Sequence, residues 1–289
     1  MNNSPLWNFE PGRTGFLAPG KTLPIRGIAW AAVLYAITFG FMFVSVFASQ
    51  WLKLPQAATY ATALLVPVIG FAFYWLLVTV CEKRRPLEIV FKPSSLIDLA
   101  VGFVIGFVLI VLMLAVVYAM GFYRIKTGHL TGWFNSLVFD SYISGMLEEL
   151  AFRAILLRIF ARMFNPLAGL VISSALFGAA HLTHGTPFQA LQIALIAGLT
   201  LGLPYMLTGR LWISVGMHIG WDFTEESLLG VNTTHGLLLS TPDPAHSALF
   251  TGGAYGPDGS LLAVLLAALF VAGMLYSNKK GWFRLHGGS

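Results

Sequence analysis

The chain has 289 residues, of which 57% are hydrophobic and only 10% are charged, and its mean hydropathy is +0.77. Soluble domains carry roughly 25% charged residues, so this composition excludes an ordinary soluble protein and predicts an integral membrane protein. The net charge of +5 comes from basic residues beside apolar segments, so we expect membrane lipid and no nucleic acid as a partner. The single cysteine, Cys81, excludes an intramolecular disulfide and a thiolate metal cluster.

The first 26 residues form a polar segment interrupted by four prolines. This segment (1–26) lacks the apolar core and small-residue cleavage site of a secretory signal, so we expect it to remain as a cytoplasmic N-terminal segment. Residues 27–289 are expected to form a single transmembrane domain with eight helices. The expected spans are 27–49, 59–80, 97–122, 135–160, 167–183, 188–207, 211–229 and 261–277.

The distribution of basic residues predicts the orientation of these spans. If both termini are cytoplasmic, 13 of the 17 Lys and Arg residues lie inside the cell and only Lys53, Arg124 and Lys126 lie outside, while Arg153 lies within the membrane. We therefore expect a multi-pass protein of the cell membrane with both termini in the cytoplasm. The segment 230–260 is rich in Gly, Pro and turn residues and is expected to be an ordered outer loop or a re-entrant element.

The run MLEELAFRAILLRIF at 146–160 contains three charged residues inside an expected span, Glu148, Glu149 and Arg153. Each charge at the centre of a membrane helix costs roughly 2.5 to 3.5 kcal/mol, so these side chains are expected to be paired or functional. Glu149 precedes Arg153 by four residues, the favourable order for an ion pair on one helix face. Glu148 is left without a local cation, as a general base would be. The alternative is an ion-pair network that only fixes helix packing.

Two later spans carry more polar residues at the same four-residue spacing. SSALFGAAHLTHG contains Phe177 and His181, and SVGMHIGWDF contains His218 and Asp222. The Asp222 carboxylate can hold the His218 imidazole in one orientation. A single intramembrane histidine is more often a helix-contact residue, but carboxylates, histidines and an arginine on three helices are typical of a functional site. Glu225 lies seven residues after His218 and three after Asp222, so it could join the site, but its place near the helix end favours a solvated rim residue.

Signatures of other hydrolases are missing from the sequence, which contains neither an H-E-x-x-H zinc helix nor a G-x-S-x-G elbow. Three motifs, Glu-Glu-x-x-x-Arg, Phe-x-x-x-His and His-x-x-x-Asn/Asp, occur in order over about 134–230. In this combination the chain resembles the CPBP family, also called Abi. That family contains the type II, Ras-converting CAAX prenyl proteases and bacterial relatives that include bacteriocin-processing and self-immunity proteins. Where the family often has Asn, this chain has Asp222.

The resemblance implies an all-α polytopic membrane protein with eight transmembrane helices and an active-site cavity between helices 4, 5 and 7. It also implies an intramembrane endopeptidase in which Glu148 and His181 activate water. His218 and Asp222 would then orient that water or stabilise the oxyanion. The other carried-over roles are supporting ones: Arg153 would hold Glu149, and Phe177 would wall the substrate cavity.

A metal requirement stays open at this point. Two histidines and a carboxylate form the open three-ligand set of a catalytic zinc site, whereas no helix carries the paired histidines of zinc proteases. Some relatives are described as metalloproteases and others as glutamate-dependent enzymes without a metal. If one divalent metal such as zinc is bound, the expected ligands are Glu148, His181 and His218.

Three functions agree with these residues. The first is a CAAX-protease-like membrane endopeptidase acting on a peptide or a lipidated protein. The second is a non-proteolytic membrane interaction or bacteriocin-immunity protein that retains the cavity. The third is a proton-coupled transporter with Glu148 and the histidines as a relay, but the matching halves typical of such transporters are not evident in the sequence.

Overall fold

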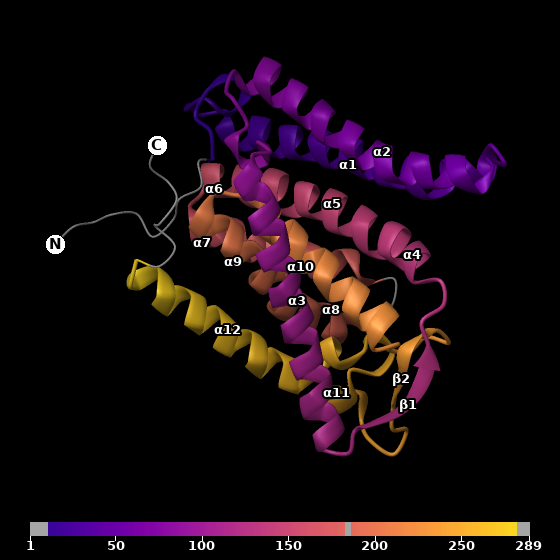
Figure 1. Ribbon diagram of the computed structural model, residues 1–289. Helices are drawn as coiled ribbons and strands as arrows, with labels where there is room; N and C mark the ends of the chain where they lie inside the picture. Colours follow the sequence, from indigo (N-terminus) through magenta and orange to yellow (C-terminus); the bar gives the residue numbers. More distant parts are fainter. Residues whose placement is uncertain (1–10, 183–185, 282–289) are drawn as a thin grey trace.

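The computed structural model describes residues 11–182 and 186–281, and these fold into long helices that pack side by side (Figure 1). Residues 1–10 of the predicted N-terminal segment, the end of the predicted span 167–183, and Arg284 lie outside the described residues. The helices are α1 (Leu23–Trp51), α2 (Gln56–Leu77), α3 (Pro93–Ala119), α4 (Trp133–Asn135), α5 (Ile143–Glu149), α6 (Arg158–Met163), α7 (Pro166–Ala180), α8 (Pro187–Ile193), α9 (Leu199–Thr208), α10 (Leu211–Phe223), α11 (Ala248–Thr251) and α12 (Leu261–Lys279).

Several of these helices continue into one another through π-helical turns, which often mark functional sites. These turns extend α2 and α10 and join α4 to α5, α5 to α6, and α8 to α9: Val78–Glu82, Thr224–Leu228, Ser136–Tyr142, Leu150–Leu157 and Ala194–Gly198. With the turns included, each of the eight predicted spans coincides with a helical run. The run 133–163 carries Glu148, Glu149 and Arg153, and the run 211–228 carries His218 and Asp222.

Five of these runs are long and apolar enough to cross a membrane: Leu23–Ala48, Gln56–Glu82, Pro93–Ala119, Pro187–Thr208 and Leu261–Lys279. The helix α7 is apolar but has only 15 residues. The runs 133–163 and 211–228 contain more charged residues than an ordinary span. Some of the residues that weaken the hydropathy signal, such as Glu149 and Asp222, belong to the candidate site. Eight crossings stay a prediction.

A two-stranded antiparallel sheet departs from the all-α expectation. Strand β1 (Tyr123–His129) pairs with β2 (Gly236–Pro242), with Tyr123 opposite Pro242 and His129 opposite Gly236. Arg124 and Asp243 extend this contact with an ion pair of 3.0 Å. The segment 230–260, expected as a loop or re-entrant element, thus contains a strand, the short helix α11 and tight turns. Its partner strand lies more than a hundred residues away, which local sequence patterns do not reveal.

Glycines hold α3 and α10 in unusually close contact, and the two helices lie side by side in Figure 1. A Cβ atom added at Gly102 or Gly106 of α3 would lie 2.2 or 2.1 Å from a backbone oxygen of α10. Conversely, one added at Gly216 or Gly220 of α10 would lie 2.3 Å from a backbone oxygen of α3. Such small-residue pairs, four positions apart, let membrane helices approach closely. The contact fixes one face of α10, and His218 lies between its two glycines in the sequence.

A buried ion-pair cluster joins the end of α2 to the start of α6. Arg158 and Glu82 are both fully buried, and two guanidinium nitrogens of Arg158 donate to the two Glu82 oxygens at 2.8 and 2.7 Å. Arg84 and Glu88 form a second pair at 2.6 Å beside them. Burial raises the pKa of Glu88, but hydrogen bonds from Arg84 and the charge of Arg158 outweigh burial and hold this pKa below its ordinary value. Arg158, which the sequence analysis counted only as a cytoplasmic basic residue, therefore also stabilises the packing of α2 against α6.

Apolar side chains form two large clusters on either side of α10. One surrounds the run 133–163 and includes Phe152 and Phe177, while the other joins α3 to α12. The candidate site lies where these two clusters meet the polar residues of α10. The scaffold around the site is consequently built from tightly packed helices.

Candidate active site

Glu149 and Arg153 form a buried ion pair where α5 passes into the π-helical turn. Arg153 Nη1 donates to Glu149 Oε1 at 2.8 Å, as their spacing predicts, and both side chains are almost completely buried. Arg153 also donates to the carbonyl of Ala197 at 3.2 Å, and its guanidinium carbon lies 4.6 Å from the centre of the Phe177 ring. The carboxylate, the carbonyl and the ring together compensate the charge of Arg153.

His218 reaches the same carboxylate from the neighbouring helix α10. Its Nδ1–H donates to Glu149 Oε1 at 2.9 Å, whereas its Nε2 lies 3.5 Å from Asp222 Oδ2. The shorter contact makes Glu149 the main partner of the ring, a role that the sequence assigned to Asp222. Glu149 thus bridges Arg153 and His218, and its second oxygen, Oε2, is buried without a hydrogen-bond partner among the described residues.

His181 follows the last residue of α7. Asn165 and Pro166 set the start of this helix, because Asn165 Oδ1 accepts from the backbone N–H of Ala168 at 2.9 Å. His181 Nδ1 lies 2.8 Å from the carbonyl oxygen of Phe177 and must donate to it, since a carbonyl can only accept. In the neutral ring, Nε2 then carries the free lone pair. His181 is therefore oriented to accept a proton or a hydrogen bond through Nε2.

His181 and His218 line one small cavity with a volume of about 100 Å³. It has room for a few water molecules, and polar and apolar side chains share its wall. The lining residues are Phe177, His181, Ile193, Ala197, Leu201, His218, Trp221, Asp222, Glu225, Tyr255 and Asp258. They come from α7, the run 187–208, α10 with its π-helical turn, and the turns before α12. Helices 5 and 7 of the expected setting line this cavity, but no residue of the fourth helical run does, and the sixth run and a loop form the rest of the wall. An active-site cavity between helices 4, 5 and 7 therefore stays a prediction.

Glu148 lies close to this group but does not line the cavity. Its side chain is partly exposed, and its charge acts on Tyr35, Arg153, His218 and Asp222. Glu148 is therefore near both Arg153 and His218, the two residues that bind Glu149. That Glu148, His181 and His218 meet in one water-filled space stays a prediction.

Two polar cavity residues, Tyr255 and Asp258, escaped the sequence analysis, and a third, Glu225, was weighed for the site but assigned to the rim. Glu225 was expected to be solvated, but it faces the cavity, and its Oε1 is buried without a hydrogen-bond partner in the described chain. Asp258 lies opposite, and burial raises its pKa to about 7. Tyr255 donates through its hydroxyl to the backbone carbonyl of His181 and so ties the loop to α7. Only tertiary contacts bring these loop residues to α7 and α10, and the sequence offers no signal for them.

Within the part of the chain that the structure describes, the side chains do not form a metal-ligand set. In residues 11–182 and 186–281, no group of three or more His, Cys, Asp or Glu side chains is arranged to hold a metal ion. Glu148 does not line the cavity, and His218 donates its Nδ1–H to Glu149 and keeps Nε2 on the cavity side. The ligand set of Glu148, His181 and His218 therefore stays a prediction. We therefore derive no catalytic step through a metal.

Residues 131–224, about a third of the chain, match the family model described as type II CAAX prenyl endopeptidase Rce1-like. This segment contains all three motifs, from Glu148 to Asp222. Over these residues the chain is similar to the Rce1-like family. No curated protein and no solved structure matches the chain. Together with the apolar helices, this similarity indicates a multi-pass membrane protein. At the level of the family it supports a CAAX-protease-like intramembrane endopeptidase.

Proposed function

We propose that this protein hydrolyses a peptide bond within the membrane and that the attacking group is a water activated by Glu148 and His181. One observation carries the proposal: Glu149 bridges Arg153 and His218 at 2.8 and 2.9 Å inside the segment that matches the Rce1-like family. If Glu149 served only to neutralise the buried Arg153, it would not need to bind His218 as well. The shared carboxylate also fixes a histidine that faces a cavity, as positioned catalytic groups require.

In this mechanism Glu148 takes the proton of the attacking water, and His181 Nε2 accepts a hydrogen bond from the same water. His218 donates its Nδ1–H to Glu149, so Nε2 is the atom it offers to the cavity. The neutral ring accepts a hydrogen bond from the water at Nε2, and the protonated ring donates from Nε2 to the oxyanion. Phe177 lines the cavity and lies beneath Arg153, so it keeps bulk water from the Glu149 and Arg153 pair. The proton held on Glu148 then passes to the departing amine.

The substrate we propose is a protein or peptide whose C-terminal region carries a prenylated cysteine. The proposal is supported by the family description and by a site set among apolar helices, to which a lipid-modified chain has direct access from the bilayer. No water-soluble domain is seen in the described residues that could collect substrates from solution.

The test is cleavage of a farnesylated CAAX peptide by the purified protein in proteoliposomes, comparing the wild type with Glu148→Gln. Glutamine keeps the size of the side chain but cannot take a proton from water, so turnover should fall by about 10² to 10⁴-fold. Thermal unfolding in detergent checks that the variant is folded. The control is Asp243→Asn, a carboxyl beside the β1–β2 sheet that pairs with Arg124 and does not line the cavity.

Two results would contradict the proposal. If the folded wild type cleaves neither the peptide nor proteins in a membrane extract, the non-proteolytic interaction role takes precedence. If Glu148→Gln keeps wild-type turnover, the base is another residue. Uptake of the peptide into the same proteoliposomes, driven by a proton gradient and without cleavage, would instead support the transporter.

A further inference from the structure

His181 follows the last residue of α7 and is held there by three hydrogen bonds. Its N–H donates to the carbonyl of Gly178 at 3.0 Å, and its Nδ1–H donates to the carbonyl of Phe177 at 2.8 Å. The carbonyl of His181 has no partner within the helix, as is usual for the last carbonyls of a helix. This oxygen accepts from the hydroxyl of Tyr255, which comes 74 positions later in the chain. The backbone that carries the His181 ring is thus fixed partly by a contact from outside α7.

Tyr255 belongs to a closed turn formed by residues 252–260, between α11 and α12. Gly252 has a φ of +78°, and a Cβ atom added to it would overlap the carbonyl oxygen of Gly256. Gly256 has a φ of +97° and a ψ of −175°, a combination that is essentially restricted to glycine. The N–H of Tyr255 donates to the carbonyl of Gly252 at 3.3 Å. The turn is therefore closed by its own backbone, and Tyr255 projects from it in a fixed direction.

Three side chains from other parts of the chain hold the start of this turn. They are Tyr123 of β1, Gln189 of α8 and Asn232, and they donate to the consecutive carbonyls of residues 251–253 at 2.8, 3.0 and 3.0 Å. Tyr123 and Gln189 are buried, and hydrogen bonds are stronger where water is excluded. The turn therefore links β1 and α8, which carry none of the motif residues, to the end of α7.

We infer that Tyr255 is a positioning residue for the proposed hydrolysis: through the carbonyl of His181 it fixes the end of α7 and so the direction of His181 Nε2. This inference rests on the proposed function. Tyr255 lines the same cavity as His181, but its hydroxyl hydrogen is engaged by the backbone carbonyl and takes no part in proton transfer. A catalytic group that is misplaced by about 1 Å can lose about 10²-fold in rate.

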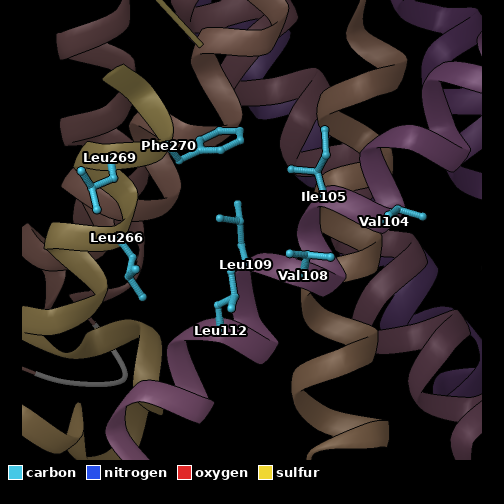
Figure 2. A pocket seen from close by; sticks show the side chains of 8 residues that line it. All are labelled: Val104, Ile105, Val108, Leu109, Leu112, Leu266, Leu269 and Phe270. Carbon is cyan, nitrogen blue, oxygen red and sulfur yellow. The ribbon is translucent and has the colours of Figure 1, made fainter. Parts of the chain in front are cut away.

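A general effect on the packing of α12 is the alternative, since the turn leads directly into that helix. The helix packs against α3 around an apolar groove of about 480 Å³, which Figure 2 shows. None of the candidate site residues lies in the described wall of this groove. Phe270 lines the groove and packs against two buried apolar clusters. A smaller side chain at this position therefore weakens the packing of α12 without a direct contact to the site.

The experiment compares Tyr255→Phe, which removes only the hydroxyl, with Phe270→Leu and with Tyr118→Phe, a change of an exposed tyrosine in α3. The kcat and KM for a farnesylated peptide are measured in proteoliposomes. We expect Tyr255→Phe to lower kcat by about 10- to 100-fold and to keep KM within about twofold, because the hydroxyl orients a catalytic group and does not bind the substrate. Phe270→Leu should lower the unfolding temperature and keep kcat. Tyr118→Phe should change neither quantity.

Two further measurements separate positioning from a general loss of structure. When 4-aminophenylalanine replaces Tyr255, its amine can donate to the same carbonyl, so kcat should return to within about threefold of the wild type. In protein with isotope-labelled histidine, the signal of the His181 ring is assigned by its absence in His181→Gln. This signal should shift or broaden in Tyr255→Phe and stay unchanged in Phe270→Leu.

The outcomes distinguish this inference from the proposed function. If the wild type cleaves no peptide, the proposed function is wrong and the catalytic role of Tyr255 falls with it, whereas a shifted His181 signal would still show the contact. Wild-type kcat or an unchanged His181 signal in folded Tyr255→Phe overturns the inference alone. An equal loss of kcat in Phe270→Leu overturns it as well. If Tyr255→Phe does not fold, Tyr123→Phe decides instead: it loosens the start of the turn, and an unchanged kcat would contradict the inference.

Discussion

At the scale of single residues, Glu149 links the two helices of the candidate site. Its Oε1 accepts from Arg153 and from His218, and the side chain is fully buried. Asp222 has a weaker claim on His218, because the distance of 3.5 Å from Nε2 exceeds that of a good hydrogen bond. The order of importance of the two acids therefore follows from their contacts with the ring.

We predict that Glu149→Gln is more harmful than Asp222→Asn. The amide removes the counter-charge of a buried arginine, and breaking such a pair costs about 3 to 5 kcal/mol. It also frees the His218 ring, so turnover should fall by about 10- to 100-fold, the usual loss when a supporting partner is removed. Asp222→Asn should change both quantities less. Thermal unfolding in detergent and peptide turnover measure the two effects, and an equal or larger loss in Asp222→Asn would refute the ranking.

The contacts of Glu149 and Glu225 show which parts of the site can be predicted from the sequence. Spacing along one helix predicted the bond between Glu149 and Arg153, because both partners belong to the same helical run. The bond between Glu149 and His218 crosses from one helix to another over 69 positions, and local periodicity carries no information about such a contact. Glu225 was assigned to the solvated rim for its place near a helix end, but the turns around Asp258 cover it.

At the scale of helices, the glycine contact between α3 and α10 sets where His218 lies. An added Cβ at Gly106 would lie 2.1 Å from the carbonyl oxygen of Met217 and 2.8 Å from the backbone nitrogen of Trp221. Backbone atoms cannot move aside as a flexible side chain would. The two helices would have to separate, and His218 would move with α10.

We predict that Gly106→Ala destabilises the protein by about 1 to 3 kcal/mol, as overpacking typically does, and lowers peptide turnover. The matched control is Gly273→Ala in α12, where an added Cβ meets nothing within 4 Å. There alanine should be neutral or stabilise the helix by about 0.5 to 1 kcal/mol. Thermal unfolding of both variants in one detergent tests this, and equal unfolding temperatures would show that the helices can separate at no cost.

At the scale of the whole molecule, basic residues and contacts together define one end. The start of α1 and the end of α12 lie on the same side in Figure 1. The hydroxyl of Thr14 donates to the carbonyl of Glu82 at 2.6 Å, which joins the N-terminal segment to the loop 82–92. That loop carries Lys83, Arg84 and Arg85. Strand β1, with Arg124 and Lys126, lies at the opposite end in Figure 1.

We predict that the loop 82–92 faces the cytoplasm and that β1 faces outward, because Lys and Arg concentrate on the cytoplasmic side of membrane proteins. After Cys81→Ser removes the native thiol, Leu87→Cys and Thr131→Cys place one reporter at each end. Both positions are exposed, and neither substitution removes a basic residue. A membrane-impermeant maleimide should label Thr131→Cys in intact cells and Leu87→Cys only after permeabilisation. The reverse pattern would mean that the protein has the opposite orientation in the membrane. Labelling of both cysteines in intact cells would mean that α3 does not cross the membrane between them.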